Sequence, residues 1–128
     1  TGMIHRRIVA ETIVPFDSRR AGQTCFVMAA EFDLAIGPGG APEAEDHYLN
    51  VHTKIARRLP GLRHYLIGKL QPERGAAPER YRMAVLTFDT RDGLRGAYAS
   101  EVGQELTRDE QATIRNGRVW RLDARVEL

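Results

Sequence analysis

The chain has 128 residues, of which 42% are hydrophobic and 28% are charged, and this suits one globular domain better than a disordered chain. Its formal net charge is only +2, and its scattered arginine pairs do not alternate with aromatic residues, so we expect no nucleic-acid partner. The single cysteine, Cys25, excludes an internal disulfide framework and a cysteine-based zinc site.

The first segment, residues 1–23, contains strand-like patches that end at Pro15 and a polar linker at 17–23, which indicate an N-terminal arm or an extra strand. Its sequence RRIVAETIVPF lacks the long apolar region and the small-residue cleavage site of a signal peptide. No apolar run in the chain approaches the roughly 20 residues that a helix needs to span a bilayer. We therefore expect a cytoplasmic protein with no membrane partner.

The main domain is expected at residues 24–128 and begins with a strand at 24–32, TCFVMAAEF. The next segment, AIGPGGAP, has the glycine and proline content of a loop. It matches neither G-x-x-x-x-G-K-[ST] nor G-x-G-x-x-G, so its glycines do not form a phosphate-binding loop. The segment from Ile36 to Asp46 leads into the following helix and is expected to border the mouth of any pocket there.

A helix is predicted from Pro42 to Leu59, because acidic residues follow its start and arginines precede its end. Pro60 and Gly61 stop it. Its apolar face has the 3.6-residue spacing of a buried stripe. This face consists of Ala44, Tyr48, Val51, His52, Ile55 and Leu59.

The rest of the chain completes a doubled β-α-β pattern. It contains strands at 62–71 and 81–89, helices at 90–101 and 102–114 with a break near Gly103, and a strand at 117–128. The order β-α-β-β-α-β is the ferredoxin-like arrangement, which predicts an α+β fold with a four-stranded antiparallel sheet and helices on one face.

The strands are apolar on both faces. In YRMAVLTFD one face carries Tyr81, Met83 and Val85, and the other carries Ala84, Leu86 and Phe88. A sheet with one face in water should alternate apolar and polar residues, so the second face must also be covered. This pattern predicts a homodimer whose sheets pack face to face.

His52 is the first candidate for a functional residue, because it lies inside the apolar stripe of the predicted helix. It can be a buried histidine that bonds a carbonyl or a tyrosine hydroxyl, or a general acid or base in an apolar pocket. His64 and Tyr65 are neighbours on a strand and point to opposite faces, so only one of them can share that pocket. Tyr98 and Trp120 can line a cavity or fill the core.

No metal site is expected. His47 and His52 are five residues apart, which is a poor helical spacing for joint ligation, and a third ligand is not evident. Cys25 lies in a predicted core strand, where cysteine usually only fills space. Asp109 is most simply interpreted as a surface residue of a helix.

The segment HYLNVHTKIARRLPGLRHY resembles the signature of the EthD-like family of dimeric α+β barrel proteins. In that family an aromatic residue and then a histidine lie on the first helix, followed by a PG stop and a strand with an aromatic start. AVLTFDTRDGLRGAYASEVGQELTRDE resembles the second half of the family, so that the resemblance covers residues 24–127. Residues 3–23 and the long segment AIGPGGAPEAED depart from the family pattern.

This family has mixed functions. It includes a protein associated with the degradation of ethyl tert-butyl ether, and it is similar to methylmuconolactone isomerase and to cyclases and oxygenases of aromatic polyketides. In the isomerase, the histidine before PGL and the tyrosine after it belong to the active site, and they match His52 and Tyr65. The resemblance therefore implies a homodimeric, cofactor-independent isomerase, cyclase or lyase acting on a small hydrophobic cyclic or aromatic compound. His52 would move a proton, Tyr65 would donate a hydrogen bond to a carbonyl or enolate, and Tyr48, Tyr98 and Trp120 would line the substrate pocket.

Two other functions stay open. The protein can be a non-catalytic binding or accessory protein of a degradation or biosynthesis pathway, or a cofactor-free oxygenase. A base with a perturbed pKa in an enclosed pocket would argue against the first, and oxygen uptake would identify the second.

Overall fold

The computed structural model describes residues 6–16, 22–72 and 81–125. Most of the polar linker predicted at 17–23 and most of the segment between the two middle strands lie outside these ranges. The elements, in chain order, are β1 (Arg6–Val14), β2 (Thr24–Leu34), α1 (Gly40–His47), the π-helical turn η2 (Tyr48–His52), α2 (Thr53–Ala56), β3 (His64–Pro72), β4 (Arg82–Phe88), α3 (Arg91–Ala99), α4 (Glu101–Thr113) and β5 (Ile114–Arg125).

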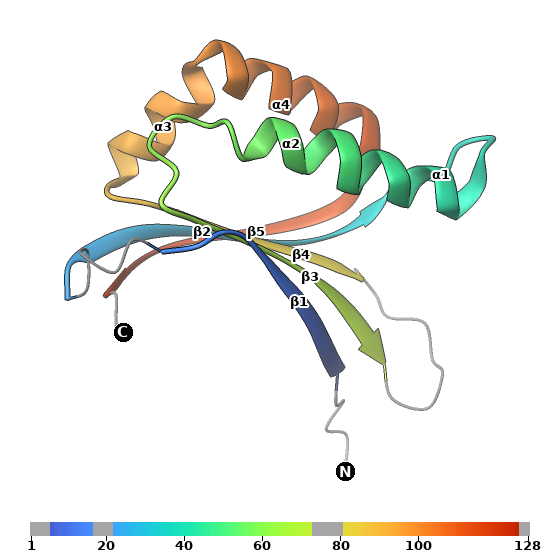
Figure 1. The fold of residues 1–128 in the computed structure, drawn as a ribbon, viewed down its shortest axis with the longest axis horizontal. Helices are drawn as coiled ribbons and strands as arrows, with labels where there is room; N and C mark the ends of the chain where they lie inside the picture. The colour runs from blue at the N-terminus through green and yellow to red at the C-terminus, as the bar shows by residue number, and fades with distance from the viewer. Residues whose placement is uncertain (1–5, 17–21, 73–80, 126–128) are drawn as a thin grey trace.

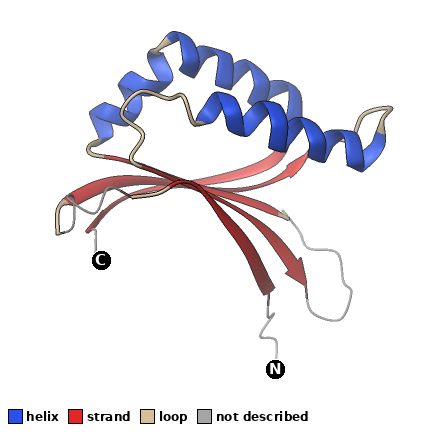
Figure 2. Ribbon diagram, viewed as in Figure 1, coloured by secondary structure: helices blue, strands red, loops and turns tan. Residues whose placement is uncertain are grey.

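The strands form one antiparallel sheet in the order β1-β3-β4-β2-β5, and the helices cover one of its faces (Figures 1 and 2). This confirms the predicted ferredoxin-like α+β fold. The sheet has five strands and not the predicted four, because β1 pairs along β3, for example Ile8 with Leu70 and Thr12 with Leu66. Pairing of β1 protects what would otherwise be an open edge of β3.

The register of the strands sets the face that meets the helices. Met28 of β2 and Tyr65 of β3 are both paired with Leu86 of β4, so the three side chains lie in one row. All three are buried under the helices. The same face of the sheet contributes most of the core, which includes Phe26, Phe32, Ile67, Ala84 and Phe88.

The first helical region runs from Gly40 to Ala56, two residues earlier at its start and three earlier at its end than predicted. The last three residues of the segment AIGPGGAP, which was expected to be a loop, therefore belong to helix α1. The unexpected feature is the π turn η2, Tyr48–His52, in the middle of this region. Tyr48 and His52 are both buried beneath it, as the apolar stripe predicted, whereas Val51, which the stripe also included, is 41% exposed.

The second helical region breaks at Ser100, three residues before the predicted break at Gly103. The Ser100 hydroxyl oxygen accepts a hydrogen bond from the backbone N–H of Gly103 at 3.1 Å and so caps α4. Gly103 packs closely against the end of α3. A Cβ atom at this position would lie 2.2 Å from the carbonyl oxygen of Ala97 and 2.4 Å from Cα of Tyr98.

The variant Gly103→Ala is therefore expected to destabilise the protein by about 1–3 kcal/mol, because backbone atoms would have to move. Gly96→Ala is the matched control, since a Cβ atom on Gly96 in α3 would meet nothing within 4 Å. There, alanine should raise stability by roughly 0.5–1 kcal/mol. Urea unfolding measures the free energy of unfolding of both variants. Equal values for the two would contradict the close contact of α3 with α4.

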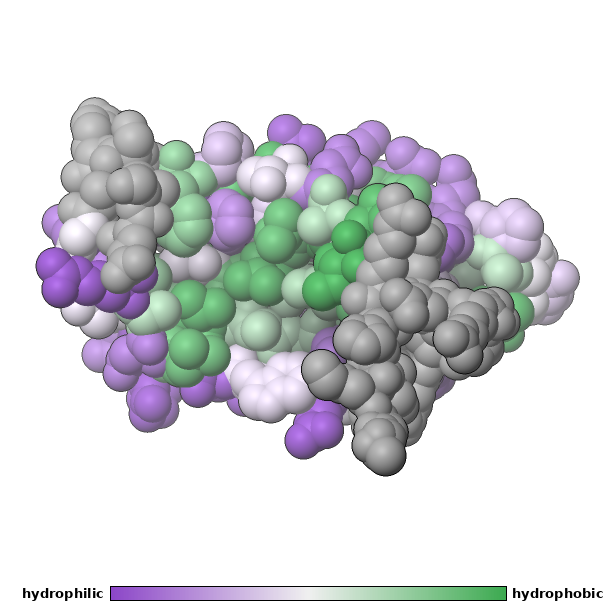
Figure 3. Space-filling model, turned by 90° about the horizontal axis from the view of Figure 1, so that it is seen from below, coloured by the Kyte–Doolittle hydropathy of each residue, from purple (hydrophilic) through white to green (hydrophobic). Residues whose placement is uncertain are grey.

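The face of the sheet away from the helices is also apolar. Trp120 and Leu122 of β5 lie beside Ala29 and Val27 of β2 on this face, and Val85 of β4 lies on the other side of Ala29. Figure 3 shows this face with apolar residues across its middle. Trp120 is 39% exposed and Leu122 48% exposed. The second apolar face that the sequence predicted is thus present, and no described helix covers it.

In the described ranges of the chain, the helices are all too short or too polar to cross a membrane.

Candidate active site

A cavity of about 170 Å³ lies between the helices and the sheet. Its size is similar to that of a cavity of about 150 Å³ that is known to hold benzene. Most of its wall is apolar, from side chains such as Met28, Phe32 and Leu106. Its polar groups include His52, Tyr65 and Glu110, together with Tyr98 and Arg121.

His52 is held in the wall of this cavity by a carboxylate on another helix. Its Nδ1 lies 2.7 Å from Oδ2 of Asp109 in α4, and Nε2 of His47 lies 2.6 Å from the other oxygen, Oδ1. In a regular α-helix, residues five apart differ by about 140° around the axis. The wider π turn η2 reduces this difference and brings both imidazoles to one carboxylate. Such turns are frequent at functional sites.

The charges of this group follow from its burial and its hydrogen bonds. Burial alone would raise the pKa of Asp109, but hydrogen bonds from the two histidines hold that pKa below its usual value. Burial lowers the pKa of His52, and the Asp109 carboxylate offsets this only in part. At neutral pH, His52 is therefore a neutral imidazole that donates its Nδ1–H to Asp109. Its Nε2 is the nitrogen that remains for a molecule in the cavity.

Tyr65, and not His64, shares the cavity with His52. The ring of His64 stacks on Phe16 instead, with ring centroids 4.2 Å apart. Tyr65 is only 1% exposed, and burial raises its pKa well above the usual value. Its hydroxyl therefore stays protonated and can donate a hydrogen bond.

The three other aromatic residues predicted to line the pocket lie in different places. Tyr98 lines the cavity. Tyr48 lies behind His52, with the two rings stacked at 5.3 Å, and does not reach the cavity wall. Trp120 points to the opposite face of the sheet, where Arg118 lies over its ring. The placement of Trp120 corrects the sequence interpretation, because strand alternation directs its neighbour Arg121 to the cavity and Trp120 away from it.

The segment before the helix also lies elsewhere than predicted. Ile36, Gly37 and Glu43 border a separate cavity of about 360 Å³, which includes His47 but shares no residue with the wall around His52. Within the residues that the structure describes, no group of three or more His, Cys, Asp or Glu side chains is arranged to hold a metal ion.

Glu110 is a second titratable residue of the cavity, and the sequence analysis missed it. Burial, and to a smaller extent the neighbouring Asp109 carboxylate, together raise its pKa to about 7. The sequence signal was its position, since Gly103, Leu106 and Glu110 follow one another at helical spacing and the first two are buried. An acid that continues a buried stripe is a candidate for a perturbed pKa.

The pKa of Glu110 predicts a pH-dependent stability that the variant Glu110→Gln should lack. The folded protein holds this proton up to about pH 7, whereas the ordinary value for the residue is 4.5. The folded state thus binds more protons between these values, so stability falls as the pH rises through them. Relative to Glu110→Gln, the free energy of unfolding of the wild type should fall by up to about 3 kcal/mol as the pH rises from 4.5 to about 7. Urea unfolding of both proteins at several pH values measures this, and parallel curves would contradict it.

No protein-family model matches this chain. Among curated proteins, an uncharacterized 11.0 kDa protein in the thcB-thcC intergenic region of Rhodococcus erythropolis is 26% identical over 72 residues, which are 56% of this chain and 70% of that protein.

Similar solved structures extend over most of the chain. An EthD (ethyl tert-butyl ether) family protein of Bacillus halodurans has a TM-score of 0.60 at 18% identity, covering 77% of this chain and 97% of that one. A dimeric ferredoxin-like protein of unknown function from Thermobifida fusca has a TM-score of 0.61 at 16% identity and covers 81% and 94%. SnoaB, a cofactor-independent oxygenase from Streptomyces nogalater, has a TM-score of 0.52 at 17% identity and covers 84% and 98%. The chain therefore has the fold of the EthD-like dimeric α+β barrel proteins, as its sequence motifs predicted.

Proposed function

We propose that this protein is a small-molecule enzyme that moves protons on a hydrophobic cyclic or aromatic compound without a cofactor. The observation that carries the proposal is that His52, in the wall of a mostly apolar cavity, is hydrogen-bonded to the carboxylate of Asp109. Asp109 fixes the imidazole in the tautomer whose Nε2 is basic, and burial keeps the ring neutral at pH 7. A neutral imidazole held by a carboxylate is a suitable general base.

The proposed reaction begins at a carbon next to a ring carbonyl. Nε2 of His52 takes the proton, and the electron pair of the broken C–H bond moves to the carbonyl oxygen as an enolate. The hydroxyl of Tyr65 stabilises this oxygen by a hydrogen bond. Where a C=C bond adjoins that carbon, the enolate is a dienolate, and a proton is returned to its far carbon while the double bond shifts. This proton comes from His52, or from Glu110, whose pKa is about 7 and which then recovers the proton that His52 took. The net result is an isomerisation, and a ring closure or elimination can follow from the same enolate.

We also propose that the enzyme works as a homodimer that buries the open apolar face of the sheet. Two structures with this fold, from Thermobifida fusca and from a Jannaschia species, are described as dimeric. Soluble monomers rarely expose a large continuous apolar patch. The face with Val27, Val85 and Leu122 is such a patch, and a second copy of the chain would cover it.

A cofactor-free oxygenase is the second candidate, and the likeness to the fold of SnoaB favours it. The same base would remove a proton from the substrate, and the resulting carbanion would react with oxygen. An accessory protein would only bind the compound against the apolar wall of the cavity. His52 would then take part in no reaction.

Isotope exchange separates these functions before the natural substrate is known. A panel of cyclic ketones, lactones and aromatic carbonyl compounds would be incubated with the protein in D₂O and followed by proton NMR. A proton-transfer enzyme should incorporate deuterium next to the carbonyl of at least one compound. Oxygen consumption with each compound identifies the oxygenase. Binding of compounds without exchange and without oxygen consumption would contradict both enzymatic functions.

A further inference from the structure

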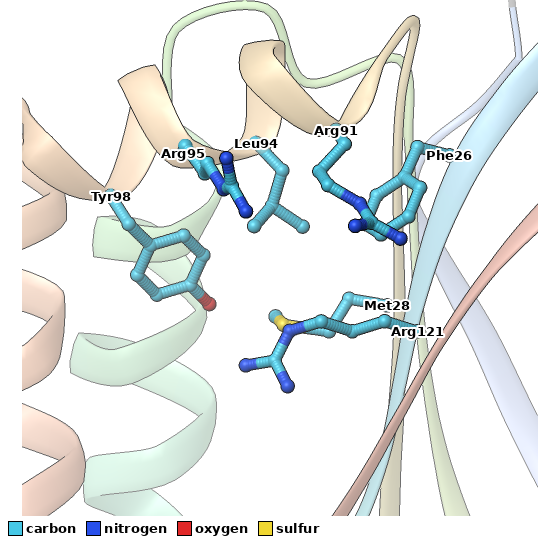
Figure 4. A pocket seen from close by; sticks show the side chains of 7 residues that line it. All are labelled: Phe26, Met28, Arg91, Leu94, Arg95, Tyr98 and Arg121. Carbon is cyan, nitrogen blue, oxygen red and sulfur yellow. The ribbon is translucent and has the colours of Figure 1, made fainter.

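A second, larger cavity adjoins the one around His52. It has a volume of about 560 Å³ and is lined by residues of α3, β2 and β5 (Figure 4). Met28, Tyr98 and Arg121 line both cavities. A single ligand can therefore extend from the inner cavity, beside His52, into the outer one.

The outer cavity is lined by three arginines, two from α3 and one from β5, and by apolar side chains. Arg91 and Arg95 are four residues apart on α3 and so share one helix face. Arg121 reaches the cavity from β5, because its register partner Met28 faces the helices. In Figure 4 the guanidinium groups of Arg95 and Arg121 and the hydroxyl of Tyr98 point into a common space. The guanidinium of Arg91 lies over the ring of Phe26, 5.3 Å from its centroid.

These arginines lack the acidic partners that other arginines have. Arg82 pairs with Glu45 and Arg58 with Glu105. Among the described residues, neither Arg91 nor Arg121 forms an ion pair with a carboxylate, and Arg95 reaches only the exposed Asp92, at 3.8 Å. Like charges four apart on a helix repel each other, so this grouping does not serve the stability of α3.

The group as a whole has the chemistry of an anion-binding site. A planar guanidinium donates two parallel hydrogen bonds to a carboxylate. Burial raises the pKa of Tyr98, so its hydroxyl remains a donor at neutral pH. The apolar side chains of Phe26, Met28 and Leu94 also line the cavity, and they would exclude water from part of the surroundings of a bound carboxylate.

We propose that the substrate is a ring compound with a carboxylate, which Arg95, Arg121 and Tyr98 bind in the outer cavity while the ring lies beside His52. This assignment rests on the proposed function, because it names the substrate class of that same site. A fixed carboxylate would orient the ring so that one C–H bond faces Nε2 of His52. It would also select against neutral rings of the same shape.

The test compares phenylacetate with 2-phenylacetamide, which has nearly the same shape and no charge. Binding to the protein is measured by NMR titration at low salt. We expect phenylacetate to bind at least about ten-fold more tightly, as one charge-assisted contact allows. Arg121→Gln and Arg95→Gln should each reduce this preference, and resonances of Tyr98 should shift. Arg108→Gln, on the exposed side of α4, is the matched control and should leave the preference unchanged.

Several outcomes would overturn the proposal. They are equal binding of the two probes, no binding of phenylacetate, and a preference that survives in both Arg121→Gln and Arg95→Gln. Inorganic phosphate that binds as tightly as phenylacetate at the same residues would show a site for free anions and not for ring acids. The test needs no turnover. A carboxylate preference without any isotope exchange would therefore retain the anion site and reject only proton transfer.

Discussion

Replacing His52 by glutamine is expected to lower the rate of deuterium exchange by about 10²–10⁴-fold, the usual contribution of a positioned acid–base group. Glutamine keeps a polar side chain of similar length but has no basic nitrogen for the cavity. The rate is measured by NMR in D₂O with the best compound of the panel. Urea unfolding of the same variant should show a loss of no more than about 1–3 kcal/mol, the cost of a disturbed buried hydrogen bond.

His47→Gln is the matched control for this variant. It also removes an imidazole that contacts Asp109, but His47 does not line the cavity around His52. The exchange rate of His47→Gln should therefore stay close to that of the wild type. A His52→Gln protein with lost stability and intact exchange would make His52 a structural residue and remove it from the mechanism.

Replacing Val85 by glutamate is expected to dissociate the homodimer. Val85 lies on β4, the middle strand of the sheet, and its side chain is on the open apolar face. A charge without a partner in a buried interface costs about 3–5 kcal/mol, which corresponds to more than about 100-fold in the dissociation constant. Sedimentation velocity at micromolar concentration should show a dimer for the wild type and a monomer for Val85→Glu.

Val9→Glu makes the same substitution on the other face of the sheet, because Val9 pairs with Lys69 and is 50% exposed. This variant should remain dimeric. A wild type that sediments as a monomer would contradict the dimer directly. A dimer that tolerates glutamate at Val85 would place the interface elsewhere on the molecule.

The fold could be predicted because the information for it is local. The alternation in strands such as TCFVMAAEF and the 3.6-residue stripe of the first helix each follow from a short stretch of sequence. The stripe also placed His52 toward the sheet correctly. The local sequence does not decide between an arm and a strand for β1, because its pairing with β3 is a contact between distant segments.

The site could be predicted only in part, because its details depend on contacts between helices. Periodic spacing assumes a regular α-helix, and the π turn η2 is what brings His47 and His52 to the same carboxylate. Asp109 looked like a surface residue because its partners are about sixty residues away in the sequence. The face that Trp120 occupies depends on the register of β5 with β2, which is a contact between distant segments, so the local sequence does not determine it.

The most direct test of the central claim is a ¹⁵N NMR titration of the histidine side chains, with His52→Gln used for assignment. The claim is that His52 presents an unprotonated Nε2 to the cavity. At neutral pH, His52 should be the neutral tautomer with its proton on Nδ1, and it should titrate below the ordinary histidine pKa because burial lowers it. Its Nε2 resonance should shift when a ring compound binds. A proton on Nε2, an ordinary titration and no response to any bound compound would contradict the claim.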